Sequence, residues 1–385
     1  MIQTAFPFLA LLLFIASMLV YLEDRSKSKL FEYLPAIVIL YFTVMSLASL
    51  GVWHKSEEIT MVYKGFKSNL LPAMIFLMLL QSDVRAILKL GRKILLTFFL
   101  ASLSISLGFV VMFALLHRFF EPTAWQAFGA LSGSWMGGTG NMVAIQGALG
   151  LEDSKMGYVL LIDSIDYAIW VMILLALVPL ASKFNRWSGA DGMVLEGLKA
   201  RLERTEMIPH SFPSLFMLLG LSLMVSVLAQ EIAPLLPTTS FLTQTTWIVL
   251  FATVAGILAG MTHLNRHQSA ATLANMMLYL IVALIASRAD FAELTEAPLY
   301  IMAGFMIILI HALIMVLFAK LFKLDLFSLG VASLANIGGV ASAPILAGAY
   351  HKALIPIGVL MAMMGYIIGT FMGLGVSKVL MIIAT

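Results

Sequence analysis

The chain has 385 residues, of which 61% are hydrophobic and only 11% are charged, and its mean hydropathy is +1.01. This composition excludes an ordinary soluble domain and predicts an all-α integral membrane protein. The net charge of +3 gives no sign of nucleic-acid binding, and the absence of cysteine excludes disulfides and thiolate metal sites.

Apolar stretches long enough to cross a bilayer follow one another along the chain. We expect membrane spans at about 4–22, 33–53, 93–117, 156–181, 211–230, 241–262, 268–287, 298–319 and 354–380. A shorter stretch at 69–81 is expected to be a tilted span that extends upstream past Lys64 and Lys67. The first stretch has no basic residues before it and no small-residue cleavage site after it, which favours a retained span over a cleaved signal. The sequence therefore predicts about ten spans.

Two further stretches, at about 124–150 and 326–350, are each broken by a Gly-Gly pair. Residues 129–142 align with 330–343 without a gap, and both glycines of each pair are among the identities. Glycine disfavours a helix interior, and opened backbone inside a membrane is tolerated only where it is buried in protein or faces a water-filled cavity. Broken segments at matching places in two halves of a membrane protein indicate a transporter binding site.

The distribution of basic residues distinguishes crossing segments from hairpins. If both broken stretches are re-entrant hairpins and the N-terminus is outside, most of the 23 Lys and Arg residues lie in cytoplasmic loops. If both stretches cross the membrane, most of these residues lie outside. The hairpin arrangement gives each half an odd number of crossings, so that the second half is inverted, the two hairpins are opposed, and both termini lie outside.

This arrangement divides the chain into three parts. Residues 1–181 form the first transmembrane repeat, and residues 211–385 form the second, inverted repeat. Residues 182–210 form a cytoplasmic linker, in which Val194, Leu195, Leu198 and Leu202 share one face of an interfacial helix. A solvated linker without that helix is the alternative.

Polar and glycine residues at the two breaks are the candidates for substrate binding. Freed N–H groups and helix N-termini favour anions, whereas freed carbonyls and hydroxyls suit Na⁺. The residues expected to bind substrate are Ser134, Gly137, Gly138, Thr139, Gly140, Asn141, Asn336, Gly338, Gly339 and Ser342. The alternative is glycine packing between close helices, which is our interpretation of Gly365, Gly369 and Gly373 in the last span.

Two carboxylates, Asp163 and Asp166, lie within the apolar stretch 156–181 and three residues apart, which places them on one helix face. Carboxylates inside a membrane are costly and indicate function, and two neighbouring ones repel unless one is protonated or a cation lies between them. We expect Asp163, Ser164 and Asp166 to couple transport to a cation, with Asp166 as the essential group and Asp163, Asp166 and Thr139 as a candidate Na⁺ site. A hydrated pair near the membrane boundary is the alternative. His311, alone in another apolar stretch, is expected to be a buried, hydrogen-bonded histidine.

Residues 137–141, Gly-Gly-Thr-Gly-Asn, resemble the Gly-Gly-x-Gly motif at the tips of the two re-entrant loops in sodium-coupled glutamate and 2-hydroxycarboxylate transporters. Gly338 and Gly339 match only the glycine pair of that motif. Residues 132–142 and the Asp-Ser-x-Asp-Tyr sequence that begins at Asp163 resemble a YjcL-like family of bacterial membrane proteins. This resemblance extends over nearly the whole chain. The transporter resemblance implies a mobile core that bears the hairpins, a scaffold of the remaining helices, and a homodimer.

These features predict a secondary active transporter of the elevator type that moves a small organic anion (an amino acid, a carboxylate or a small peptide) with Na⁺ or H⁺. A cation/proton antiporter without an organic substrate is the alternative. An intramembrane aspartyl enzyme is disfavoured, because such a dyad draws its carboxylates from two helices. We therefore expect no enzymatic activity, no cofactor beyond the coupling ion, no nucleic-acid partner, and a multi-pass protein of the bacterial inner membrane.

Overall fold

The computed structural model describes the chain except for residues 27–34, 55, 191–206, 240 and 290–296, and in the described part every regular element is a helix. The α-helices of the first half are α1 (Ala5–Arg25), α3 (Ala36–Ser49), α4 (Glu57–Leu80), α5 (Val84–Leu88), α6 (Arg92–Leu116), α7 (Ala124–Gly137), α8 (Thr139–Leu149), α9 (Met156–Leu177) and α10 (Ala181–Ser188). Those of the second half are α12 (Phe212–Ile232), α13 (Gln244–Gly260), α14 (Ser269–Ala286), α15 (Ala297–Phe322), α16 (Leu326–Ile337), α17 (Gly339–Tyr350) and α18 (Ile355–Ala384).

Seven helices in the described part are long and apolar enough to cross a membrane: α1, α6, α9, α12, α14, α15 and α18. This finding confirms the prediction of an all-α integral membrane protein. The three other predicted spans coincide with α3 and α13, which are shorter, and with α4, which is less apolar. As expected, α4 begins upstream of Lys64, at a point where the Ser56 side chain accepts a hydrogen bond from the Ile59 N–H and caps the helix.

The linker between the two halves is described only in part. The predicted interfacial helix around residues 194–202 lies outside the described residues. Before it, α10 follows α9 after one 3₁₀ turn, and it ends at Gly189 in a left-handed conformation with φ +74°. Glycine adopts such a conformation without strain, so it is a common residue after a helix end.

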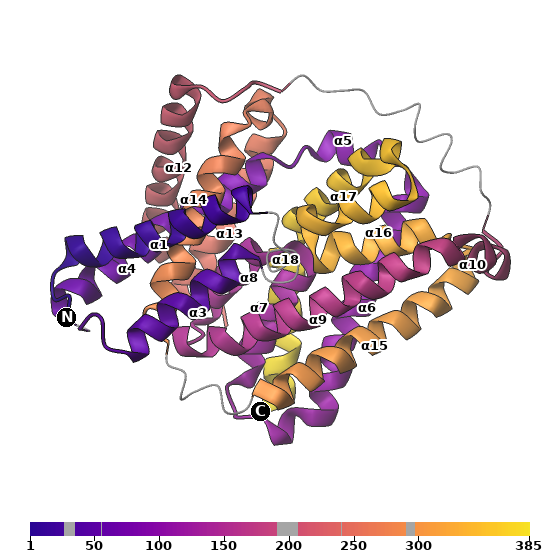
Figure 1. Cartoon of the computed structure of the whole chain (residues 1–385), viewed down its shortest axis with the longest axis horizontal. Coiled ribbons are helices and arrows are strands. Elements are labelled where there is room, and N and C mark those ends of the chain that lie inside the picture. The colour runs from indigo at the N-terminus through magenta and orange to yellow at the C-terminus, as the bar shows by residue number, and fades with distance from the viewer. Residues whose placement is uncertain (27–34, 55, 191–206, 240, 290–296) are drawn as a thin grey trace.

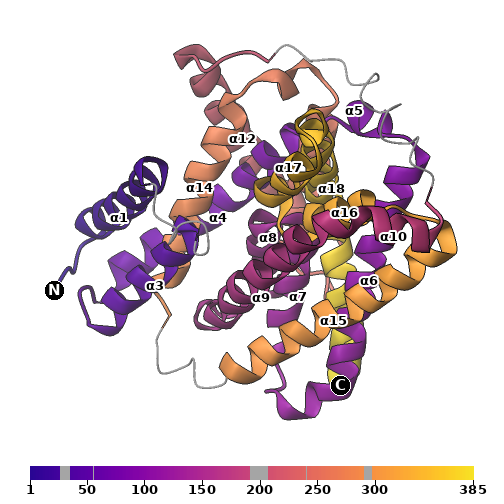
Figure 2. The same ribbon diagram turned by 45° about the vertical axis from the view of Figure 1, so that its right-hand side comes forward.

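The helices form two groups, which lie side by side in two views (Figures 1 and 2). The scaffold group contains α1, α3 and α4 together with α12, α13 and α14; within it, α4 packs against all three helices of the second half. The core group contains α6 to α9 together with α15 to α18, and within it α6 packs against α15. Each half of the chain therefore contributes corresponding helices to each group.

The first glycine-broken stretch forms a helical hairpin in which α7 and α8 run antiparallel. At its open end, Gln126 Nε2 donates a hydrogen bond to the Leu149 carbonyl at 3.0 Å. At its tip, Gly138 has φ +86°, a conformation that residues with a Cβ rarely adopt. The open end continues into the N-terminal end of α9, where Lys155 bonds to Glu121 and Thr123, the residues just before α7.

The second glycine-broken stretch also forms a hairpin, made of α16 and α17. Its open end brings the Phe327 and Tyr350 rings to a centroid distance of 5.3 Å, and Gly339 at the tip has φ +56°. The Leu326 N–H donates to Asn185 Oδ1 of α10 at 2.9 Å, which places the open end beside α10. Because α10 follows the C-terminal end of α9, the two hairpins start from opposite ends of α9 and point in opposite directions.

The last helix, α18, packs tightly against α7. An added Cβ at Gly369 would lie 2.6 Å from Gly137 Cα, and one at Gly373 would lie 3.0 Å from Gly133 Cα. Gly365 approaches the Met136 carbonyl of α7 and the Ala335 carbonyl of α16 in the same way. The glycine face predicted in the last span is therefore a packing surface, in which small residues let two helix backbones come close together.

Candidate functional site

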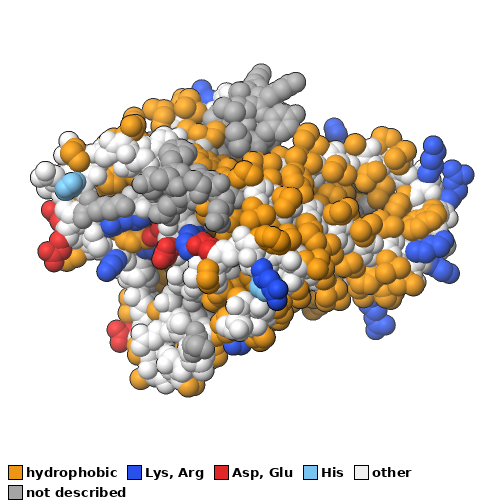
Figure 3. Space-filling view, turned by 90° about the horizontal axis from the view of Figure 1, so that it is seen from below, with side chains coloured by type: hydrophobic (Ala, Val, Ile, Leu, Met, Phe, Trp, Pro, Cys, Tyr) orange, Lys and Arg blue, Asp and Glu red, His pale blue; other side chains and the backbone are white. Residues whose placement is uncertain are grey.

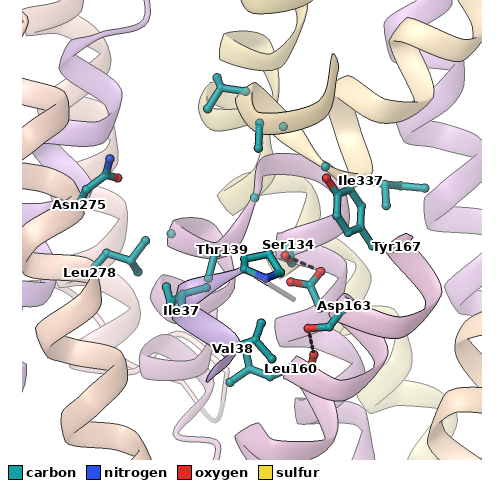
Figure 4. A pocket seen from close by; sticks show the side chains of 18 of the residues that line it. Ile37, Val38, Ser134, Thr139, Leu160, Asp163, Tyr167, Asn275, Leu278 and Ile337 are labelled. Carbon is teal, nitrogen blue, oxygen red and sulfur yellow. Dashed lines mark hydrogen bonds between the residues drawn. The ribbon is translucent and has the colours of Figure 1, made fainter. Parts of the chain in front are cut away.

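A cavity of about 270 Å³ lies between the scaffold group and the core group, and the tips of both hairpins line it (Figure 4). The predicted site residues that line the cavity are Ser134, Gly138, Thr139, Gly140, Asp163, Ser164, Gly338 and Gly339. The opposite wall comes from the scaffold group, chiefly from Ile37 and Val38 of α3 and from Asn275 and Leu278 of α14. Residues far apart in the sequence thus meet at one cavity, whose volume suits a small ligand.

Asp163 is the charged residue of this cavity. From α9, its Oδ1 accepts hydrogen bonds from Ser134 Oγ at 2.9 Å and from Trp135 Nε1 at 3.1 Å, both on the last turn of α7. No Lys or Arg lies among the described residues that line the cavity. The carboxylate is therefore held in place by two neutral donors, and a proton or a bound cation is needed to balance its charge.

Asp166 does not share that environment, which corrects the expected cation site at Asp163, Asp166 and Thr139. Asp166 is fully buried on the side of α9 that faces α15, where it packs against Gly304. Neither of its carboxylate oxygens has a hydrogen-bond partner among the described residues. The physical reason is helix geometry: three residues leave about 60° between two side chains in a helix of 3.6 residues per turn. That angle is enough to direct Asp163 into the cavity and Asp166 into the packed interior.

Four residues predicted to bind substrate, Gly137, Asn141, Asn336 and Ser342, are buried and do not line the cavity. Asn141 Nδ2 lies 3.3 Å from the Gly365 carbonyl and 3.2 Å from the Tyr366 carbonyl, so it attaches the tip of the first hairpin to α18.

Asn336 plays a comparable part in the second hairpin, because its Oδ1 accepts a hydrogen bond from Ser102 Oγ of α6 at 2.7 Å. Its Nδ2 donates to the Ala332 carbonyl of its own helix at 2.9 Å, so both ends of this buried amide have a partner. Gly137 packs against α18, and Ser342 lies beside Gly338 inside the second hairpin. These four residues position the two tips and do not face the cavity.

Several polar residues of the cavity were not predicted from the sequence, notably Tyr167, Asn275, Tyr279 and Tyr366. Two of them carried a signal in the sequence. Tyr167 lies four residues after Asp163 and hence on the same helix face, and Asn275 is an amide within an apolar span. Tyr279 and Tyr366 carried none, because only helix packing directs them to this cavity.

A second polar cluster links the scaffold group to the core group. Lys67 of α4 forms an ion pair with Asp153, which precedes α9, at an Nζ to Oδ1 distance of 2.6 Å. Asp153 also accepts hydrogen bonds from the Tyr63 hydroxyl and from Gln146 Nε2, the latter at 2.8 Å. The pair is mostly shielded from solvent, so its attraction is stronger than that of a fully exposed pair.

His311 is buried and hydrogen-bonded, as expected. Its Nδ1 lies 2.7 Å from Ser104 Oγ and its Nε2 lies 2.8 Å from Ser333 Oγ, which also accepts a hydrogen bond from Trp170 Nε1 at 2.8 Å. A neutral imidazole satisfies this chain of contacts. Among the described residues, no group of three His, Asp or Glu side chains could hold a metal ion.

Comparison with known proteins agrees with a membrane protein. The chain is 26% identical over 328 residues to the Bacillus subtilis (strain 168) protein described as "Uncharacterized membrane protein YjcL"; the alignment covers 81% of this chain and 82% of that relative. The family model described as "Protein of unknown function (DUF819)" matches residues 10–383. Since this match covers nearly the whole chain, the protein belongs to the DUF819 family of YjcL-like membrane proteins.

Proposed function

We propose that the protein is a secondary active transporter whose substrate binds in the cavity between the scaffold and core groups. One observation carries this proposal: two opposed hairpin tips and an intramembrane carboxylate meet at a single cavity. Broken elements whose tips meet between two similar halves are the arrangement from which alternating access is built. The proposal is for transport rather than enzymatic catalysis.

In this proposal, ten helices cross the membrane and the two hairpins are re-entrant. The inverted repeats are residues 1–181 and 211–385, and the cytoplasmic linker is 182–210. Three features support the arrangement: the matching helices that each half gives to the two groups, the opposite directions of the hairpins, and the basic residues expected in cytoplasmic loops. A homodimer in the bacterial inner membrane, with both termini outside, belongs to the same proposal.

The cavity suggests how substrate would cross. One wall belongs to the core group and the other to the scaffold group, and the scaffold wall near the hairpin tips includes the apolar side chains of Ile37, Val38 and Leu278. Apolar surfaces make few directional bonds that would have to break during sliding. An elevator movement would carry the core group, with its hairpins and Asp163, along this wall, whereas the Lys67–Asp153 pair would have to open.

Asp163 is the proposed coupling group. The described lining of the cavity includes no basic side chain, so the charge of Asp163 would be neutralised by Na⁺ or H⁺, with hydroxyls of Ser134 and Thr139 close to the same space. A small organic anion would then bind to the neutralised site at the N-termini of α8 and α17, where unbonded N–H groups favour negative charge. Ser164, whose hydroxyl donates to the Leu160 carbonyl at 2.6 Å, lines the cavity without being free to donate elsewhere.

The same observation also favours a second candidate function, a cation/proton antiporter without an organic substrate. A carboxylate with no basic side chain among the lining residues that the structure describes is a simpler match to a cation than to an anion.

Proteoliposomes with purified protein distinguish the two functions. An enclosed pH indicator would report proton movement driven by a Na⁺ gradient, with and without amino acids and dicarboxylates, and counterflow of labelled compounds would report organic transport. Counterflow that depends on the cation supports the symporter, whereas Na⁺/H⁺ exchange that no organic compound alters supports the antiporter. If the proteoliposomes show neither counterflow nor Na⁺/H⁺ exchange, the proposal of transport is contradicted.

A further inference from the structure

A second cavity, of about 530 Å³, lies away from the hairpin tips, between the C-terminal part of α9, α10, α15 and α16. Its lining is almost entirely apolar. Several lining side chains remain substantially exposed, including Ile173 at 43% and Val316 at 45%. Because these side chains lie on helices that are apolar enough to cross a membrane, the cavity opens on a surface that faces lipid.

The cavity exists because α16 stands away from α9. At the corresponding contact of the first hairpin, the glycines of α18 allow α7 to approach closely, as described above. The positions of α9 that align with Gly365, Gly369 and Gly373 are Ser164, Ala168 and Met172, which are larger. Trp170 also points toward α16, where it bonds to Ser333. The contact between α16 and α9 is therefore less close than the contact between α7 and α18.

The polar groups at the deep end of this cavity are already hydrogen-bonded. Trp170 Nε1 donates to Ser333 Oγ, and His311 lies between the hydroxyls of Ser333 and Ser104 at 2.7–2.8 Å. A polar ligand would have to break these bonds to gain its own, and a buried group left without a partner is costly. The interior thus accepts hydrocarbon and disfavours polar groups.

The mouth of the cavity is basic. Lys183 lines it, and no hydrogen-bond or ion-pair partner of its side chain occurs among the described residues. Lys320 lies nearby, since its Nζ donates to the Trp187 carbonyl and lies 5.3 Å from the centre of the Trp187 ring. Arg186 of α10 and Lys323 after α15 belong to the same end of the core group.

Among the described residues that line the cavity, no Asp or Glu balances these charges. The neighbouring Asp325 is buried, and it caps α16 by accepting hydrogen bonds from the Ser328 N–H and hydroxyl. Figure 3 shows Lys and Arg side chains gathered at the end of the molecule where α10 lies, next to a broad hydrophobic surface. This charge pattern favours an anionic group at the mouth.

We propose that the cavity binds one anionic phospholipid, with an acyl chain between α9 and α16 and its phosphate beside Lys183. An acyl chain meets the apolar interior and the opening faces lipid. The phosphate meets the ammonium group of Lys183, which has no partner in the part of the chain that the structure describes. The bound acyl chain fills a space between α9 and α16, whereas the corresponding space between α7 and α18 is closed by glycine packing. The acyl chain thus sets the distance between α16 and α9. This site does not depend on the proposed transport.

Native mass spectrometry of the purified full-length protein tests the site, with phosphatidylglycerol and phosphatidylcholine of the same acyl chains as probes. Ala312→Trp fills the cavity, because Ala312 lines it. Lys183→Gln removes the exposed charge at the mouth without touching the core. Arg118→Gln is the matched control. Arg118 is exposed and follows α6, and nearby Phe120 contacts Tyr300 near the start of α15, about 30 Å along that helix from Lys320.

The wild-type protein and the Arg118→Gln variant should retain one phosphatidylglycerol and should melt at a higher temperature with it than with phosphatidylcholine. Lys183→Gln should weaken binding about fivefold, the usual contribution of one basic residue to contact with anionic lipid. Ala312→Trp should lose the bound lipid; should it fail to fold, Lys183→Gln decides alone. Equal retention of both lipids, or equal binding by the wild-type protein and Lys183→Gln, would overturn the proposal. So would a cavity covered by a second copy of the chain.

Discussion

The two hairpins have matching sequences at their tips but different surroundings. The first hairpin lies against α18, where glycines of both helices meet, and Asn141 attaches its tip to the α18 backbone. The second hairpin contacts α9 through the side chain of Trp170, and a cavity of about 530 Å³ lies between α16 and the C-terminal part of α9. The Gly-Gly break thus specifies a turn in both places, whereas the neighbouring helix decides how firmly the hairpin is held.

Charge also distinguishes the two hairpins. In the first, Ser134 and Trp135 donate hydrogen bonds to Asp163. The aligned positions of the second hairpin are Ala335 and Asn336, and Met364 aligns with Asp163. Two repeats with similar backbones can therefore differ in their ionisable side chains: at this position the first repeat has a carboxylate and the second does not. A single carboxylate suits the proposed binding of one coupling ion.

The largest expected effect comes from breaking the tight contact of the first hairpin. Gly369→Leu places a side chain against Gly137 and Asn141, where no space exists, so we expect loss of about 3 kcal/mol or more of stability. Ala168→Leu, at the aligned position of α9, is the matched control and should cost much less. Thermal unfolding of both variants in detergent measures the difference. Equal destabilisation would show that the two hairpins are held alike.

The next effect concerns Asp163, the carboxylate of α9 to which the first hairpin donates hydrogen bonds. Asp163→Asn keeps the shape of the side chain and removes its charge from the cavity, so cation-dependent transport in proteoliposomes should fall to background. Asp166→Asn is the control, because Asp166 is buried away from the cavity and should leave the response to Na⁺ and pH in place. Loss of coupling only in Asp166→Asn would reverse this assignment and return the essential role to Asp166.

Alanine substitutions at the two tips compare the hairpins directly. Gly138 and Gly339 both have positive φ, so each alanine costs about 1–2 kcal/mol of backbone strain. An added Cβ at Gly138 also comes within 3.3 Å of the Tyr366 ring, whereas at Gly339 it meets nothing within 4 Å. We expect Gly138→Ala to lower the melting temperature and the transport rate more than Gly339→Ala does. The reverse order would mean that the second tip is the more constrained one.

The smallest expected effect comes from the ion pair between the two helix groups. Lys67→Met removes the ion pair of Asp153 and leaves its hydrogen bonds with Tyr63 and Gln146, which should weaken the contact between the scaffold and core groups. Because the chain has no cysteine, a single Thr139→Cys substitution provides a label at the cavity. The labelling rate of this cysteine should change when Lys67→Met is added. Lys64→Met, an exposed lysine in the same helix, should leave the rate unchanged.

The sequence alone determined the helices and the places where they break. Apolar length sets the spans, and a glycine pair inside an apolar stretch sets the hairpin turns, since both depend on residues that are close together in the chain. The glycine face of α18 and the buried His311 were also predictable, because their residue types leave few alternatives inside a membrane protein.

Only the tertiary structure decided what each helix face meets. Asp163 and Asp166 differ by a small rotation about the axis of α9, and Asn141 and Asn336 find their partners on α18 and α6, far along the chain. The scaffold wall of the first cavity and the gap beside the second hairpin likewise depend on how closely helices from both halves approach. Periodicity specifies that a helix forms; its rotation and its distance from its neighbours result from the packing of all the side chains around it.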